Sequence, residues 1–301
     1  MDRIGKFVVH KAVVPSGGAR VLFCHDPDLG LPVAVKLFQP RPDGLLSPAQ
    51  QLDRFLTEAR LLASFDHPHI VAVKGLDRLP DGRPFFVMPF QPAQLGFEIG
   101  RDFDDPAAEA RATERDRPRP LAPARALTLL RQVALGLYAL HRRGMVHRAL
   151  RPSNVLLTAR EGGGARLCDF AWVKQPGRAD LPLPETWQGD PHYTAPEQLD
   201  SATTVGPPAD LFAWGRLAAR MLTGRLTPVE TTQAALAALP GLPAGLVDLL
   251  AACLDPDPAA RPPQAGAALE ALATLPPAVA SPRPAPQVTS LRRPGPPRKP
   301  A

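Results

Sequence analysis

Apolar positions in the first part of the chain recur with the two-residue period of β-strands. Valine-rich runs are bounded by glycine, proline and aspartate, a pattern that predicts strands. Such runs cover residues 7–14, 21–25, 32–38, 71–76 and 84–88. The turn signal between the first two runs, Pro15-Ser16-Gly17-Gly18, is typical of a hairpin. We therefore expect a five-stranded antiparallel sheet.

A helical pattern interrupts these strands over residues 48–65. Apolar side chains return there at three- and four-residue spacing and form one face: Leu52, Phe55, Leu56, Ala59 and Leu62. Ser47 followed by Pro48 is a favourable start, because serine caps free amides and proline suits the first turn. One helix is thus expected beside the sheet.

Beyond residue 122 the pattern is mainly helical. Helices are expected over residues 124–143, 209–223, 231–238, 244–254 and 263–275. Residues 91–122 are charged, proline-spotted and aperiodic, which indicates a long surface loop or insertion, disordered in part. The result is an α+β fold with an N-terminal lobe of about residues 1–88 and a helical lobe of about residues 92–275. A cleft between two lobes is a natural ligand site.

The positive charge is concentrated at the C-terminal end. The chain has 301 residues, 39 of them proline, and a formal net charge of +6. Residues 276–301 hold five basic side chains and no acid, which leaves 30 basic against 29 acidic residues elsewhere. No nucleic-acid-binding surface is therefore expected on the folded part. This Pro/Arg-rich tail is expected to be disordered, either as a solvated linker or as a polyproline segment that contacts a partner.

Cysteine usage and the apolar segments suggest a compartment. Cys24, Cys168 and Cys253 are far apart and form no metal-type pair, as expected in a reducing environment. The N-terminus has no apolar signal core, and the apolar stretch 234–254 is broken by two prolines and an aspartate. We expect a cytoplasmic protein without a membrane span.

Seven short motifs occur in one order along the chain. They are Val33-Ala34-Val35-Lys36, Glu58, His147-Arg148-Ala149-Leu150-Arg151-Pro152-Ser153-Asn154, Cys168-Asp169-Phe170-Ala171, Ala195-Pro196-Glu197, Asp210 with Trp214, and Arg261. Each is weak alone, whereas all seven in this order are specific. Over about residues 4–275 the chain resembles the eukaryotic-type (Hanks-type) Ser/Thr protein kinases, in a form similar to the bacterial ones. The resemblance implies the bilobal protein-kinase fold, and the Ala-Pro-Glu element favours protein kinases over small-molecule kinases.

By this resemblance, four side chains would hold ATP and magnesium. Lys36 would reach the α- and β-phosphates, and Glu58 would pair with Lys36. Asp169 would bind magnesium that bridges the phosphates, and Asn154 would hold a second metal ion. Both are hard oxygen ligands of the kind that magnesium prefers. Taken alone, Lys36 and Glu58 read as surface residues.

The resemblance also implies an adenine pocket. Val21 and Ala34 from the upper lobe and Leu156 from the lower lobe would enclose the ring. Met88 would be the gatekeeper residue, followed by a hinge that contains Phe90 and offers backbone hydrogen bonds. All of these residues also suit an ordinary hydrophobic core, and the two interpretations are compatible.

Two further sets of positions match in a structural role. A stack that links the lobes in active kinases would consist of Leu62, Val73, His147 and Phe170. In the lower lobe, Glu197 would pair with Arg261, and Asp210 would accept hydrogen bonds from the backbone of the His147-Arg148 loop.

The departures from the family pattern cluster on the chemistry. Ala149 stands where the family has the aspartate that accepts the substrate hydroxyl proton, and a methyl group cannot accept a proton. Arg151 replaces a lysine, which keeps the charge but changes the geometry of the donors. The three glycine positions of the phosphate loop hold Val14, Ser16 and Ala19. Side chains there hinder close approach of backbone to phosphate, so weak nucleotide binding is expected.

Asp190 follows Gly189, where the family usually has threonine. Its carboxylate would then lie near the position that Ala149 leaves empty. We consider two roles for Asp190: a poor substitute base, or a partner of Arg151 that locks the loop.

Three functions remain open at this point. The first is a pseudokinase that acts as a binding or regulatory module, with residual ATP–magnesium binding. The second is a Ser/Thr protein kinase of low or atypical activity. The third is another nucleotide-dependent transferase on the same fold. A protein partner is expected, with residues 91–122 and the tail 276–301 as the contact regions.

Overall fold

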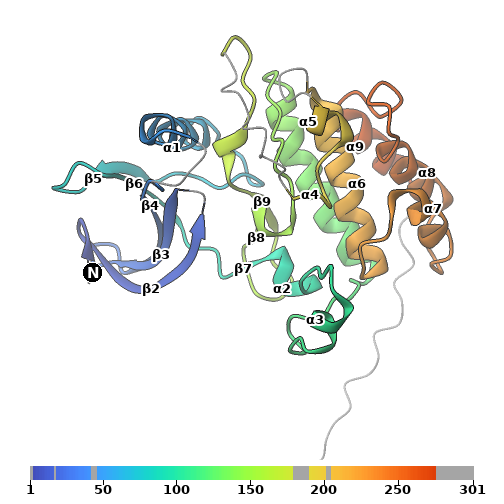
Figure 1. The fold of residues 1–301 in the computed structure, drawn as a ribbon, viewed down its shortest axis with the longest axis horizontal. Helices are drawn as coiled ribbons and strands as arrows, with labels where there is room; N and C mark the ends of the chain where they lie inside the picture. The colour runs from blue at the N-terminus through green and yellow to red at the C-terminus, as the bar shows by residue number, and fades with distance from the viewer. Residues whose placement is uncertain (1–2, 17, 42–45, 179–189, 201–204, 276–301) are drawn as a thin grey trace, which may run out of the picture.

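A computed structural model of the chain describes residues 3–16, 18–41, 46–178, 190–200 and 205–275. Figure 1 shows two lobes, a twisted sheet with helix α1 beside it and a larger lobe of helices. Among the described residues, no helix is both long and apolar enough to cross a bilayer. The Pro/Arg-rich tail 276–301 lies outside the described residues.

The N-terminal sheet has one strand more than the five expected. Its strands are β1 (Arg3–Ile4), β2 (Phe7–Ser16), β3 (Ala19–Asp26), β4 (Leu31–Phe38), β5 (Gly75–Arg78) and β6 (Pro84–Pro89), in the antiparallel order β1-β2-β3-β4-β6-β5. The added strand β1 has two residues, too few to produce a detectable period. The expected strand 71–76 begins later, because the amide of Val71 donates to the carbonyl of Leu167 in the other lobe (2.9 Å).

Helix α1 (Pro48–Ala63) begins where the sequence predicted. The Ser47 hydroxyl accepts from the Gln50 amide (3.3 Å), and the Gln50 side chain accepts from the Ser47 amide (2.9 Å). This capping box satisfies two amides at the helix start. Phe55, Ala59 and Leu62 from the predicted apolar face are buried. The helix therefore holds its polar residues, among them Glu58, at fixed positions next to the sheet.

The helical lobe is built around α6 (Pro207–Thr223), most of which is buried. It packs against α4 (Pro123–His141), and the indole of Trp214 donates to the carbonyl of Leu130 (3.0 Å). The remaining elements are α5 (Pro196–Asp200), α7 (Val229–Ala237), α8 (Ala244–Cys253), α9 (Ala265–Thr274), η1 (Pro152–Asn154), η2 (Phe170–Trp172), and a small sheet of β7 (Ala93–Gln94), β8 (Val155–Leu157) and β9 (Ala165–Leu167). The long predicted helices are therefore present, with ends shifted by one or two residues.

Residues 91–122 differ from the expected irregular loop. They contain β7, α2 (Leu95–Ile99) and α3 (Pro106–Ala110), and they lie below the helical lobe in Figure 1. The Arg119 guanidinium donates to the carbonyl of Glu98 (2.7 Å) and to carbonyls within residues 114–117. Gly100 has φ +80°, and a Cβ there would lie 2.0 Å from the Arg117 carbonyl oxygen. Hydrogen bonds to backbone thus order this segment together with the buried side chains of Leu95 and Ile99 in α2.

Candidate functional site

Cross-strand pairing places four of the predicted site residues on one face of the N-terminal sheet. Val21 lies opposite Lys36, and Ala34 lies opposite Met88. Because side chains alternate along a strand, Ala34 and Lys36 point to the same side. Val33, Val35 and Leu37, which alternate with them along β4, belong to a separate hydrophobic cluster on the other face of the sheet. The strand register thus brings together the residues expected to line a nucleotide pocket.

Lys36 and Glu58 form a buried ion pair between β4 and α1. The Lys36 ammonium lies 2.7 and 2.8 Å from the two Glu58 carboxylate oxygens and 3.7 Å from an Asp169 oxygen. Burial alone would lower the pKa of Lys36, but the two carboxylates outweigh it and the pKa is raised. Lys36 is therefore held as a cation that points toward Asp169.

The hinge connects β6 to β7. Phe90 packs against Phe23 with 4.4 Å between ring centroids, and the Gln91 side-chain amide donates to the carbonyl of Pro89 (3.3 Å). Leu156 lies on β8 in the lower lobe and is half-buried, as are Val21 and Ala34. This partial exposure leaves part of each side chain accessible to a ligand.

Asp210 fixes the loop that follows α4. Its carboxylate accepts from the amides of His147 (2.7 Å) and Arg148 (2.8 Å) and is 2.9 Å from His141 Nε2. Burial acts to raise the pKa of Asp210, but the His141 hydrogen bond and charge and the His147 amide outweigh it and lower the pKa. Arg148 adopts φ +63°, a left-handed conformation that few residues adopt outside functional loops. The predicted brace on this loop is therefore present.

Ala149 lies in this braced loop and contacts Asn154, one of the two residues expected to hold magnesium. The Asn154 side-chain nitrogen donates to the Ala149 carbonyl (2.8 Å), so its amide oxygen is the atom that could bind a metal ion; this oxygen also accepts from the Ser153 hydroxyl (3.3 Å). Asp169 is partly exposed and also has a left-handed backbone, with φ +63°. An amide oxygen and a carboxylate suit magnesium, so the donor set fits the ion that the resemblance implies.

The predicted pairing of Asp190 with Arg151 is absent from the described residues. The Asp190 carboxylate accepts from the backbone amide of His192 (3.2 Å), as aspartate often does at the start of a turn. Its carbonyl accepts from the amides of Tyr193 (2.9 Å) and Thr194 (3.0 Å). Local hydrogen bonds thus hold Asp190 in the turn, and the locking hypothesis is wrong for this conformation. The substitute-base role of Asp190 remains a prediction.

The two structural sets named from the sequence are assembled. His147 and Phe170 contact edge to face at 5.4 Å, and both are buried, as is Leu62. Arg261 pairs with both carboxylate oxygens of Glu197 (2.8 and 2.9 Å). The lower lobe and its link to the upper lobe are therefore intact around the site.

Two contacts between α1 and the segment after Asp169 had no signal in the sequence. The Arg178 guanidinium donates to the Thr57 hydroxyl (2.6 Å) and pairs with Asp53. The Arg54 guanidinium lies over the Trp172 ring at 3.7 Å. These contacts hold α1 toward the lower lobe, which keeps Glu58 beside Lys36. The paired residues are more than 110 positions apart in the sequence, so only the folded structure could reveal these contacts.

Comparison with known proteins decides the family. The family model described as the protein kinase domain matches residues 16–272, most of the chain. The chain belongs to the protein kinase family. Its relatives place it among the Hanks-type Ser/Thr kinases of bacteria, which agrees with the order of its motifs.

Three bacterial relatives illustrate the chain's position in the family. It is 31% identical over 226 residues to serine/threonine-protein kinase pkn2 of Myxococcus xanthus, which covers 74% of this chain and 25% of that protein. It is 30% identical over 286 residues to PknL of Mycobacterium tuberculosis (89% and 66%) and 33% identical over 210 residues to PknK of the same organism (69% and 17%). The chain thus spans about a quarter of the Myxococcus relative.

Proposed function

We propose that this kinase-fold chain is a pseudokinase, which binds ATP and magnesium weakly and acts as a binding or regulatory module for a protein partner. The observation that carries the proposal is Ala149 in a loop that Asp210 and Asn154 otherwise hold in shape. Loss of a positioned base typically lowers the rate about 10²–10⁴-fold. A well-formed loop without its proton acceptor suits binding better than phosphoryl transfer.

The hairpin formed by β2 and β3 supports weak nucleotide binding. Pairing between β2 and β3 continues through Val14↔Val21 and Pro15↔Arg20 to Ser16↔Ala19. Proline has no amide hydrogen, and paired strands leave fewer backbone donors free to surround a phosphate than a glycine-rich loop does. Lys36, Asn154 and Asp169 remain as the principal groups for ATP and magnesium.

A specific observation also favours a second function, a Ser/Thr kinase of low activity. The Lys36–Glu58 pair is closed at 2.7 Å, and the relatives are named as Ser/Thr protein kinases. Such a kinase would have to transfer phosphate without the missing base.

ATP with magnesium is expected to raise the melting temperature of the chain. A ligand that binds only the folded state adds RT ln(1 + [L]/Kd), which is about 1.4 kcal/mol at ten times Kd. For a domain of this size that corresponds to a few degrees. The measurement is a thermal shift with millimolar ATP and magnesium.

The matched control for this shift is a double variant, Lys36→Met with Glu58→Gln. It removes the phosphate-binding cation without leaving a buried unpaired carboxylate, which a single substitution would do. The double variant is expected to fold and to lose most of the shift. No shift of the parent chain at millimolar ATP would refute nucleotide binding and leave a purely structural fold.

A further inference from the structure

The hinge, residues 89–92, lies between the two groups of residues expected to enclose a nucleotide base. Just before it, the gatekeeper Met88 lies opposite Ala34 of the upper lobe. Just after it, Gln94 lies opposite Leu156 of the lower lobe. A base held between Ala34 and Leu156 would therefore meet the polar groups of the hinge along one edge, and these groups would decide which base is accepted.

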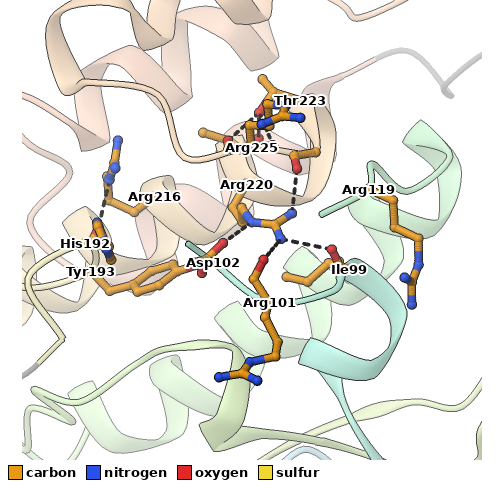
Figure 2. Close-up of polar contacts among 12 residues, drawn as sticks. Ile99, Arg101, Asp102, Arg119, His192, Tyr193, Arg216, Arg220, Thr223 and Arg225 are labelled. Carbon is orange, nitrogen blue, oxygen red and sulfur yellow. Dashed lines mark hydrogen bonds and ion pairs between the residues drawn. The ribbon is translucent and has the colours of Figure 1, made fainter. Parts of the chain in front are cut away.

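Contacts at both ends hold the hinge in place. At its start, the ring of Phe90 packs against Phe23 of β3, with 4.4 Å between the ring centroids. Beyond its end, Leu95 and Ile99 of α2 are buried. Figure 2 shows the guanidinium of Arg220, from α6, which donates to the carbonyl of Ile99 (2.9 Å). The hinge is thus anchored to the sheet and to the helical lobe, so a ligand would meet its polar groups in a fixed arrangement.

The backbone of the hinge has few hydrogen-bond donors. Its sequence is Pro89-Phe90-Gln91-Pro92, and proline has no amide hydrogen, so two of the four residues offer no backbone donor. The side chain of Gln91 adds one, because its Nε2 atom donates to the carbonyl of Pro89 (3.3 Å). Gln91 is only half-buried, so part of its carboxamide stays open to a ligand.

The contact between Gln91 and Pro89 changes what the hinge offers to a base. A free carbonyl would accept from the 6-amino group of adenine. Here the side-chain nitrogen of Gln91 already donates to that carbonyl, and its second hydrogen makes the same place a donor. The carbonyl also fixes the orientation of the carboxamide, because the reverse orientation would bring two oxygen atoms together. A donor at this place suits an oxygen at position 6 of a purine and opposes an amino group there.

We propose that the hinge selects nucleotides whose purine carries an oxygen at position 6, those of guanine and hypoxanthine, over adenine nucleotides, and that Gln91 sets this preference. The 6-oxygen would accept from Nε2 of Gln91, which would keep its hydrogen bond to Pro89. Adenine would have to displace the Gln91 side chain before its amino group could reach the carbonyl. This preference rests on the nucleotide binding proposed above, and it is a second reason to expect weak binding of ATP.

Four nucleotides separate the effect of position 6 from that of position 2. ATP and 2,6-diaminopurine riboside triphosphate carry an amino group at position 6, whereas inosine triphosphate (ITP) and GTP carry an oxygen. The second nucleotide of each pair adds an amino group at position 2. Each is titrated with magnesium against the chain, and Kd is taken from the rise in melting temperature. ITP and GTP are expected to bind about tenfold more tightly than the other two, because a hydrogen bond replaces a contact between two donors.

Gln91→Glu is the sharpest variant, because it keeps the size of the side chain and replaces the donor by an acceptor. A carboxylate cannot donate to a 6-oxygen but accepts from a 6-amino group, so ATP is expected to bind more tightly than GTP. Gln91→Leu is the matched neutral control, and it is expected to lose the preference for a 6-oxygen because the Pro89 carbonyl becomes free. The readout is the ratio of Kd values between nucleotides, in which a general effect of the added charge on the triphosphate cancels.

Three results would overturn the selection of a 6-oxygen by Gln91. They are ATP binding at least as tight as that of GTP and ITP, a preference that follows the amino group at position 2, and a 6-oxygen preference that survives Gln91→Glu. Any of them leaves nucleotide binding itself intact. No thermal shift with any of the four nucleotides would refute nucleotide binding and the selection together, so the two failures are distinguishable.

Discussion

Ala149→Asp is expected to raise phosphoryl transfer from ATP by about 10²-fold or more, the usual contribution of a positioned base. The loop around Ala149 is already held by Asp210 and by the side chain of Asn154, so the new carboxylate would enter a formed site. The measurement is transfer of labelled γ-phosphate to the chain itself and to casein, at saturating ATP and magnesium.

Ala149→Asn is the matched control for this gain. It has nearly the same shape as aspartate but cannot accept a proton in the same way, so its rate is expected to stay near that of the parent. Equal, near-zero rates for the parent and for Ala149→Asp would show that the phosphate hairpin, and not the missing base, limits transfer.

Asp210→Ala is expected to cause the largest loss of stability of the substitutions considered. The change leaves the buried amides of His147 and Arg148 and the ring of His141 without their acceptor. Each buried group left unsatisfied costs about 1–3 kcal/mol, so the free energy of unfolding should fall by at least about 3 kcal/mol. Urea unfolding followed by circular dichroism measures the loss.

Asp248→Ala provides the comparison for this loss. Asp248 is exposed on α8, and a surface substitution of this kind typically changes stability by less than about 0.5 kcal/mol. If Asp210→Ala were no more destabilising than Asp248→Ala, the brace would not contribute to the fold, and the loop at Ala149 would lack the support inferred here.

The regular part of the fold was predictable because its signals are local. The period-two runs gave the main strands, and Ser47-Pro48 with its apolar spacing gave α1. Strand β1 was missed because two residues carry no period. Helix α2 was missed because two buried apolar residues, Leu95 and Ile99, are too few to show a helical period. Helix α3 was missed because none of its residues is buried.

The site residues that could be predicted are those in the motifs that occur in one order along the sequence. Lys36 pairs with Glu58, and Asp210 accepts from the backbone of the His147-Arg148 loop, as the resemblance implied. The magnesium-binding role of Asp169 stays a prediction. The turn that holds Asp190 was not foreseen, because it rests on a local hydrogen bond to the His192 amide that the order of the motifs does not indicate.

Transfer of labelled γ-phosphate by the parent chain tests the central claim most directly. The assay compares the parent with the Lys36→Met and Glu58→Gln double variant, which serves as the measure of contaminating kinases. A pseudokinase predicts the same background level in both proteins, in the chain itself and in casein. Transfer by the parent that the double variant abolishes would contradict the claim and establish an active kinase without its usual base.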